Sequence, residues 1–314
     1  MAEPGPGGER RGPAARTATP SLAALSFPAP AKVNLYLHVT GRRADGYHEL
    51  DSLIAFAGVG DTVTVWPADD LSLAVDGPFA DRLPPAPDNL VLRAARRLAR
   101  AAGVEAAAAI TLTKRLPVAS GLGGGSADAA ATLRALARLW GLPADDGRMK
   151  DLALGLGADV PACLGGACAF VGGIGERLRP APPLPPAWLV LAYPGVPLAT
   201  AAVFAGRAAP FSRPAPFDDV PAAARALAAL LAARRYDLTE AAAARAPAVG
   251  EALAVLEAEA GSLLARMSGS GATCFALFAG AGEAQTAAQR IATAHPGWWV
   301  AAAPLLADAA RAEF

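Results

Sequence analysis

The glycine-rich stretch at residues 116–141 constrains the fold of this chain more than any other part of it. In "LPVASGLGGGSADAAATLRALARLWG", four glycines fall within residues 121–125, and an alanine-rich helical pattern follows at once. Glycine adopts positive φ and lets backbone amides approach a ligand closely, and the first amides of a helix lack partners within it. The stretch therefore predicts an anion site, with phosphate as its commonest occupant. A tight turn that only leads into the helix would use the same residues.

Two familiar phosphate motifs do not match this stretch. A Walker A loop ends in Gly-Lys-Ser/Thr, whereas Gly125 is followed directly by Ser126. A dinucleotide fingerprint that began at Gly121 would need glycine or alanine at position 126. The sequence therefore indicates a phosphate loop of another kind.

Composition and charge exclude several partners. The 28 Lys+Arg residues balance 28 Asp+Glu, so the net charge gives no reason to expect nucleic acid or an anionic membrane surface. Cys163, Cys168 and Cys274 have neither the spacing of a zinc site nor the even number of a disulfide framework. The longest uncharged run, residues 187–206, is broken by prolines and a glycine and makes a poor membrane span. We expect a cytoplasmic monomer or weak homodimer that acts on a small molecule.

The domain organisation follows from composition. Residues 1–26 are rich in Gly, Pro, Ala and Arg and predict a disordered extension, with a targeting peptide as the weaker alternative. The proline-rich "PAPPLPPA" at residues 180–187 is a stiff connector and the best boundary, which predicts domains at 27–184 and 185–314. The order of strands and helices indicates an α+β sandwich, not a doubly wound sheet.

Apolar periodicity predicts the main elements. "KVNLYLHV" alternates, so we expect Lys32, Asn34, Tyr36 and His38 on a polar face and the intervening residues on a core face. Three strand-like runs follow and suggest an antiparallel meander, and a helix is expected from an Asp88 cap to Gly103. The remaining expected elements are strands near 107–113, 188–194 and 298–302, helices near 126–140 and 150–156, a hairpin at 167–180 and a strand-loop-strand at 262–280.

The lysines also indicate function, because the chain has only three, at positions 32, 114 and 150. Lys114 precedes the glycine loop, where an ammonium group could reach a nucleotide or its phosphates. Lys32 stands beside Asn34 on the polar face of the first strand. Either lysine could instead be an ordinary solvated residue.

Several motifs together indicate a family. With the glycine loop, "PAKVNLYLHVTGRRADGYHEL", "GADVP" and "MSGSGATCF", the chain resembles the GHMP small-molecule kinase superfamily from Ala29 to its end. "AKVNL" followed by "GRRADGYHEL" is typical of the branch that acts on a cytidine-diphosphate derivative of methylerythritol. The resemblance implies a two-domain α+β fold, with a ribosomal-protein-S5-like ATP-binding domain followed by a ferredoxin-like α/β sandwich.

The resemblance also implies an activity and a catalytic pair. The expected reaction moves the γ-phosphoryl group of ATP to the 2-hydroxyl of the methylerythritol unit, in non-mevalonate isoprenoid precursor synthesis. Asp159 of "GADVP" would act as general base beside Lys32, which suits the chemistry of phosphoryl transfer. Mg²⁺ is expected with ATP but without a dedicated protein ligand. Asp128 could contact the metal, although we prefer a carboxylate favoured in the first helical turn.

The binding residues are carried over from the same motifs. Tyr47 and Phe204 would stack on the two faces of the cytosine ring, with His48 at its polar edge. The expected ATP-binding residues are Asn89, Lys114, Pro117, Val118, Ala119, Ser120, Gly121, Leu122, Gly123, Gly124, Gly125 and Ser126. The expected substrate-binding residues are Asn34, Tyr47, His48, Thr200, Phe204, Ser268, Gly269, Ser270 and Gly271.

Two other functions remain open on the sequence. One is a GHMP kinase that acts on mevalonate, phosphomevalonate, homoserine or a sugar, although such branches are not expected to contain "GRRADGYHEL". The other is a nucleotide-binding regulator that has kept the fold and lost catalysis. The presence of both Lys32 and Asp159 in a lysine-poor chain argues against the regulator.

Overall fold

A computed structural model describes residues 1, 24–83, 89–143 and 147–312. Most of the predicted extension, and the expected helix cap at Asp88, lie outside the described residues. The first strand starts at Leu25, two residues inside the stretch 1–26 that was predicted to be an extension.

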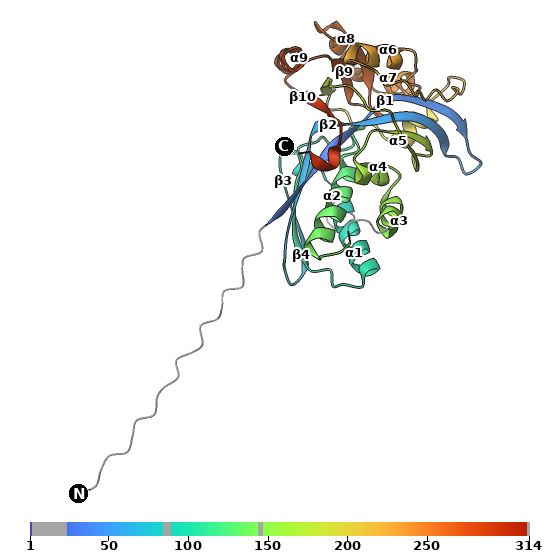
Figure 1. Cartoon of the computed structure of the whole chain (residues 1–314). Coiled ribbons are helices and arrows are strands. Elements are labelled where there is room, and N and C mark those ends of the chain that lie inside the picture. The colour runs from blue at the N-terminus through green and yellow to red at the C-terminus, as the bar shows by residue number, and fades with distance from the viewer. Residues whose placement is uncertain (2–23, 84–88, 144–146, 313–314) are drawn as a thin grey trace.

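The amino-terminal half packs four helices against one side of a curved sheet (Figure 1). Its strands are β1 (Leu25–Arg42), β2 (His48–Trp66), β3 (Leu71–Asp76), β4 (Ala108–Thr113), β5 (Ala169–Gly173) and β6 (Arg177–Pro180). Its helices are α1 (Leu90–Ala102), α2 (Gly124–Leu139), α3 (Gly147–Leu156) and α4 (Val160–Gly165). Helix α2 is buried on nearly all sides, because its alanines let α1, α4 and the sheet approach it closely.

The carboxy-terminal half has the βαββαβ order and the antiparallel strand order β10-β7-β9-β8 of a ferredoxin-like sandwich, as predicted. Its strands are β7 (Trp188–Tyr193), β8 (Leu264–Met267), β9 (Cys274–Phe278) and β10 (Trp299–Leu306). Its helices are α5 (Thr200–Ala205), α6 (Ala224–Ala232), α7 (Thr239–Arg245), α8 (Ala248–Ala258) and α9 (Ala281–Ala294).

The two halves share both a sheet and a core. Strand β10 pairs with β7, and its last residues, Leu305 and Leu306, pair with Ala57 and Phe56 of β2. One apolar cluster joins residues of β1 and β2 to residues of β7, β9 and α6. The proposed domain boundary between 184 and 185 falls in the connection from β6 to β7.

The predicted meander is wrong in two respects. The runs at 50–59 and 61–67 form the single long strand β2, because β1 pairs with it along nearly its whole length. Strand β3 pairs in parallel with β4, which lies between β3 and β2. Two short runs joined by a glycine look like a hairpin in sequence, but pairing with one continuous partner strand makes them a single strand.

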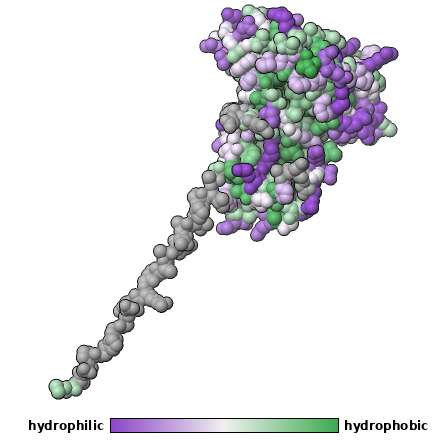
Figure 2. Space-filling view, in the orientation of Figure 1, coloured by the Kyte–Doolittle hydropathy of each residue, from purple (hydrophilic) through white to green (hydrophobic). Residues whose placement is uncertain are grey.

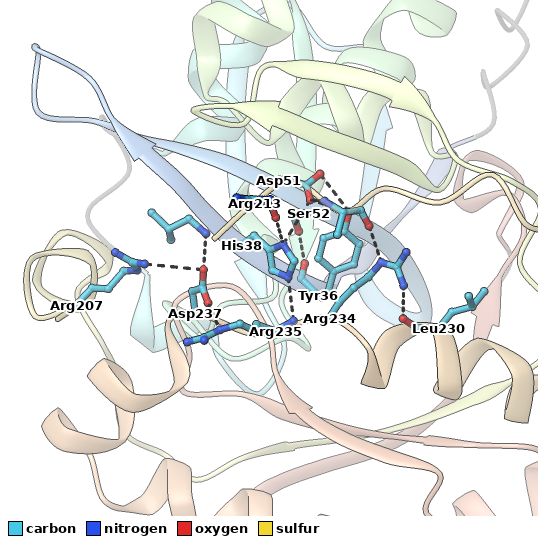
Figure 3. Close-up of polar contacts among 12 residues, drawn as sticks. Tyr36, His38, Asp51, Ser52, Arg207, Arg213, Leu230, Arg234, Arg235 and Asp237 are labelled. Atoms are coloured by element: carbon cyan, nitrogen blue, oxygen red, sulfur yellow. Dashed lines mark hydrogen bonds and ion pairs between the residues drawn. The ribbon is translucent and has the colours of Figure 1, made fainter. Parts of the chain in front are cut away.

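The predicted polar face of β1 is also buried, and its polar groups are hydrogen-bonded (Figure 3). His38 Nε2 accepts from Arg235 N at 2.9 Å, so Nδ1 bears the proton and donates to Arg213 O at 2.9 Å. The Tyr36 hydroxyl donates to Asp51, 3.1 Å away. A carboxy-terminal segment therefore covers a strand face that alternation alone assigns to solvent.

The surface view in Figure 2 shows hydrophilic residues interspersed with hydrophobic ones over the face in view. Among the described residues, no helix combines the length and apolar character that crossing a membrane requires.

Candidate active site

Lys32 and Asp159 form an ion pair between β1 and the start of α4. Lys32 Nζ lies 3.2 Å from Asp159 Oδ2, and the lysine side chain is 5% exposed against 42% for the aspartate. Asp159 occupies the N-cap position of α4, yet its side chain makes no cap hydrogen bond. The carboxylate therefore pairs with the lysine and remains open to an incoming molecule, so it is not simply a helix cap.

Asn34 orients the lysine from the same strand. Its Oδ1 accepts from Lys32 Nζ at 2.9 Å, while its Nδ2 donates to Ser52 Oγ at 2.8 Å. Ser52 in turn donates to the Tyr36 carbonyl at 2.6 Å. This chain of hydrogen bonds fixes which end of the Asn34 amide faces the ammonium group. Ser52 was absent from the sequence prediction, because its partners become neighbours only when β2 pairs with β1.

The glycine loop lies directly beside this pair. Gly123 is the N-cap of α2 with φ of 64°, and an added Cβ there would lie 3.1 Å from Lys32 Cε. The Leu122 carbonyl accepts from Lys32 N at 2.9 Å, which joins the loop to β1. The free amides at the start of α2 therefore lie next to a buried cation, a combination suited to phosphate.

The first part of the loop, residues 117–120, is a compact turn in which Ser120 Oγ donates to Pro117 O at 2.8 Å. Within it, Ala119 adopts a positive φ of 54°.

The segment Ser268–Gly271 packs against the glycine loop, backbone to backbone. Ser268 Oγ donates to Gly121 O at 3.0 Å, and Thr273 N donates to Ser120 O at 3.0 Å. Gly121 has φ of 85°, and an added Cβ would overlap the Ser268 carbonyl oxygen. The structure thus brings together motifs about 150 residues apart in the chain.

Helix α5 adds the predicted aromatic and hydroxyl groups. Thr200 Oγ1 lies 2.9 Å from Ser270 Oγ, and the Phe204 ring stacks on His48 with centroids 5.1 Å apart. Tyr47 is 60% exposed at the turn before β2. Phe204 and Tyr47 were expected on the two faces of the cytosine ring, and this stays a prediction; the structure adds a contact between Phe204 and His48.

The His48 imidazole is neutral at pH 7. Burial lowers its pKa below the usual 6.5, and the nearby Arg42 and Arg207 lower it further. A neutral imidazole has one donor and one acceptor, which suits a hydrogen-bonding base edge.

The Lys114 side chain was expected near the nucleotide, and the structure shows it buried. Its ammonium group is 2% exposed and bonds to Asp61 and, at 2.8 Å, to Asp128 Oδ2. Asp128 is likewise buried, and it lies beyond the first turn of α2, which has no acidic residue, so the first-turn interpretation is wrong. Asp61 was missed, because nothing in the local sequence marks a residue whose partners lie 53 and 67 positions away.

Asn89 is the N-cap of α1, and its Oδ1 accepts from Val91 N at 2.9 Å. The cap lies one residue after the predicted Asp88. The expected place of Asn89 near the nucleoside stays a prediction. No group of three or more His, Cys, Asp or Glu side chains that could hold a metal ion occurs within the described ranges.

Comparison with known proteins identifies the family of this chain. The GHMP kinases N terminal domain family matches residues 89–167, and the GHMP kinases C terminal family matches residues 219–297. The fold and its glycine loops are those of an ATP-dependent small-molecule kinase of the GHMP class. The 4-diphosphocytidyl-2-C-methyl-D-erythritol kinase of Paramagnetospirillum magneticum is 56% identical over 91% of this chain and 100% of that protein. The enzyme of the same name from Rhodospirillum rubrum is 52% identical over 93% of this chain and 96% of that protein.

A solved structure supports the same assignment. The crystal structure of a 4-(cytidine 5'-diphospho)-2C-methyl-D-erythritol kinase covers 90% of this chain and 99% of its own, with a TM-score of 0.75 and 36% identity. The chain belongs to the 4-diphosphocytidyl-2-C-methyl-D-erythritol kinase family.

Proposed function

We propose that the protein transfers the γ-phosphoryl group of ATP to the 2-hydroxyl of 4-diphosphocytidyl-2-C-methyl-D-erythritol, in non-mevalonate isoprenoid precursor synthesis. The observation that carries this proposal is the Lys32–Asp159 pair beside the glycine loop, 3.2 Å between charged atoms. The identity of the substrate is inferred from the names of the relatives.

In the proposed step, the substrate hydroxyl oxygen attacks the γ-phosphorus and the bond to the bridging oxygen of ADP breaks. Asp159 accepts the hydroxyl proton, a role open to it because its carboxylate is partly exposed and not engaged in capping. Lys32 pairs with that carboxylate and, with the start of α2, would offset charge on the transferred oxygens. Phosphoryl transfer depends mainly on such positioning and charge stabilisation.

ATP would lie along the backbone of residues 117–126, with its phosphates at the start of α2. Magnesium would enter with ATP, bound chiefly by phosphate oxygens and water, as this ion usually is.

The substrate would be recognised at the edge of the site formed by β2 and α5. His48 would pair with the cytosine edge, with Phe204 and Tyr47 contributing ring faces. Asn34, Thr200 and Ser268–Gly271 would position the remainder, since they connect this edge to the catalytic pair.

The test is incubation of the purified protein with ATP, Mg²⁺ and the cytidylyl methylerythritol, with product detection by phosphorus NMR. We expect ADP and a 2-phosphorylated product in equal amounts. Mevalonate, phosphomevalonate, homoserine and galactose serve as parallel substrates. Phosphorylation of one of these in place of the cytidylyl compound would overturn the proposed substrate, and an absence of turnover with all five would favour an inactive nucleotide-binding regulator.

A further inference from the structure

Beneath the glycine loop lies a buried charge cluster, the triad Asp61, Lys114 and Asp128, which the proposed reaction does not use. The exposed fractions of these residues are 0%, 2% and 2%. Lys114 Nζ bonds to Asp61 Oδ2 and Asp128 Oδ2. Burying three charged groups is costly unless each is paired, so their presence here requires an explanation.

The triad joins the three elements that hold the loop. Asp61 lies in β2, Lys114 directly follows β4, and Asp128 lies in α2. The second oxygen of Asp61 accepts from the backbone amides of Arg115 and Leu116, which lead into the loop. The entry and exit of the loop are thus fixed to one another through a single ammonium group.

Lys114 also lies close under the loop backbone. An added Cβ on Gly124, the first residue of α2, would lie 3.0 Å from Lys114 Nζ and 3.5 Å from Asp61 Oδ2. The positive end of the α2 dipole therefore has a fixed cation beneath it. Because the lysine is almost fully buried, it acts on a bound anion through the loop and not by contact.

We propose that Asp61, Lys114 and Asp128 are positioning residues, which together hold the loop in its phosphate-binding geometry. The inference rests on the proposed assignment of ATP to this loop. Its consequence is a specific one: the triad governs the affinity for ATP far more than the affinity for the alcohol substrate.

The charge balance within the triad supports this role. Burial alone would lower the pKa of Lys114, but the two carboxylates outweigh it and the pKa is raised, so the lysine stays charged. Burial and Asp61, opposed by Lys114, raise the pKa of Asp128 to about 7. Asp128 Oδ1 is buried and has no hydrogen-bond partner among the described residues. With Asp128 protonated, the triad is neutral and adds no repulsion toward phosphate.

The test compares Lys114→Met with Arg115→Met, which removes the neighbouring but solvent-exposed cation that bonds to Thr62. Binding of a non-hydrolysable ATP analogue is measured by calorimetry, alongside KM for each substrate and kcat. We expect Lys114→Met to weaken analogue binding and raise the KM for ATP by about tenfold, because the loop loses the ammonium group that joins its entry to its exit. The KM for the cytidylyl substrate should change less than about threefold, and Arg115→Met should leave all values near wild type.

Lys114→Met leaves two carboxylates without their cation and could fail to fold. The charge-balanced variant Lys114→Met/Asp61→Asn/Asp128→Asn removes that difficulty, and its folding is checked by circular dichroism. Normal ATP-analogue affinity in either folded variant would overturn the inference, as would an equal loss toward both substrates.

Binding of the ATP analogue to the Gly123→Ala variant is measured as well. It distinguishes a failure of the triad's proposed role from a failure of the proposed ATP site. If Gly123→Ala weakens binding and Lys114→Met does not, the triad has no role although the loop binds ATP. If neither variant weakens binding, ATP lies elsewhere and the assignment of the loop itself fails.

Discussion

At the scale of single residues, Asp159 differs from an ordinary helix cap because its carboxylate faces Lys32. We expect Asp159→Asn to fold and bind ATP but to lose turnover by about a hundredfold or more, as removal of a proton acceptor usually does. Single-turnover kinetics with saturating substrates measure the loss. Near-normal turnover would remove Asp159 from the mechanism.

His48 should affect one substrate only. We expect His48→Ala to raise the KM for the cytidylyl substrate by about tenfold or more. The variant loses both the proposed hydrogen bond from the imidazole to the cytosine edge and the stack on Phe204. His48→Phe is the matched variant, since it keeps the stack and removes the hydrogen bond. A change in the KM for ATP alone would contradict the base-recognition assignment.

Asp128 should make stability depend on pH. Its pKa is about 7 in the folded protein against 3.8 when exposed, so its protonated form stabilises the fold below pH 3.8 and that contribution is lost as pH rises to 7. Relative to Asp128→Asn, the wild type should lose about 1 kcal/mol or more of unfolding free energy between pH 5 and 8. Urea unfolding of both proteins at pH 5 and pH 8 measures this loss. If the difference in unfolding free energy between the two proteins were the same at both pH values, Asp128 would be ionised throughout and simply paired with Lys114.

The sequence singled out residues that belong to a motif or are rare, and the structure places two of them, Lys32 and Asp159, side by side. Lys32 stands out in a chain with three lysines, and Asp159 belongs to a recognisable motif. Lys114 is equally rare, but its burial depends on Asp61 and Asp128, whose distance from it is set by strand pairing and helix packing. The scarcity of lysine thus drew attention to Lys114 but did not indicate that its side chain is buried and paired with two carboxylates.

At the scale of elements, periodicity and capping predicted most helices and strands but not their pairing. The α1 helix ends at Gly103 in the left-handed conformation, as its glycine indicated. The long β2 strand and the parallel β3–β4 pair were missed, because both depend on contacts between distant strands.

The start of α2 gives a prediction that belongs to this scale. We expect Gly123→Ala to reduce kcat/KM for ATP by about tenfold or more, because the residue has φ of 64° and its new methyl group would press on Lys32. Gly250→Ala in α8 is the control, since nothing lies within 4 Å of the added carbon there. Equal activity of the two variants would show that the loop tolerates a side chain.

At the scale of the whole molecule, the two halves are expected to unfold together. They share an apolar cluster and the β2–β10 pairing, so opening one exposes the core of the other. Far-ultraviolet circular dichroism and tryptophan fluorescence should give coincident urea transitions, since tryptophans lie in both halves at positions 66, 140, 188, 298 and 299. Two separated transitions would show that the halves are independently stable.

The three lysines have very different surroundings, and this makes the chain well suited to chemical labelling. Lys150 is exposed, Lys114 is buried between two carboxylates, and Lys32 is 4% exposed at the floor of the site. An amine-reactive reagent should therefore modify Lys150 quickly, spare Lys114, and modify Lys32 only as the site opens. Mass spectrometry of the labelled chain would then report nucleotide occupancy from a single side chain, without a radioactive or fluorescent ligand.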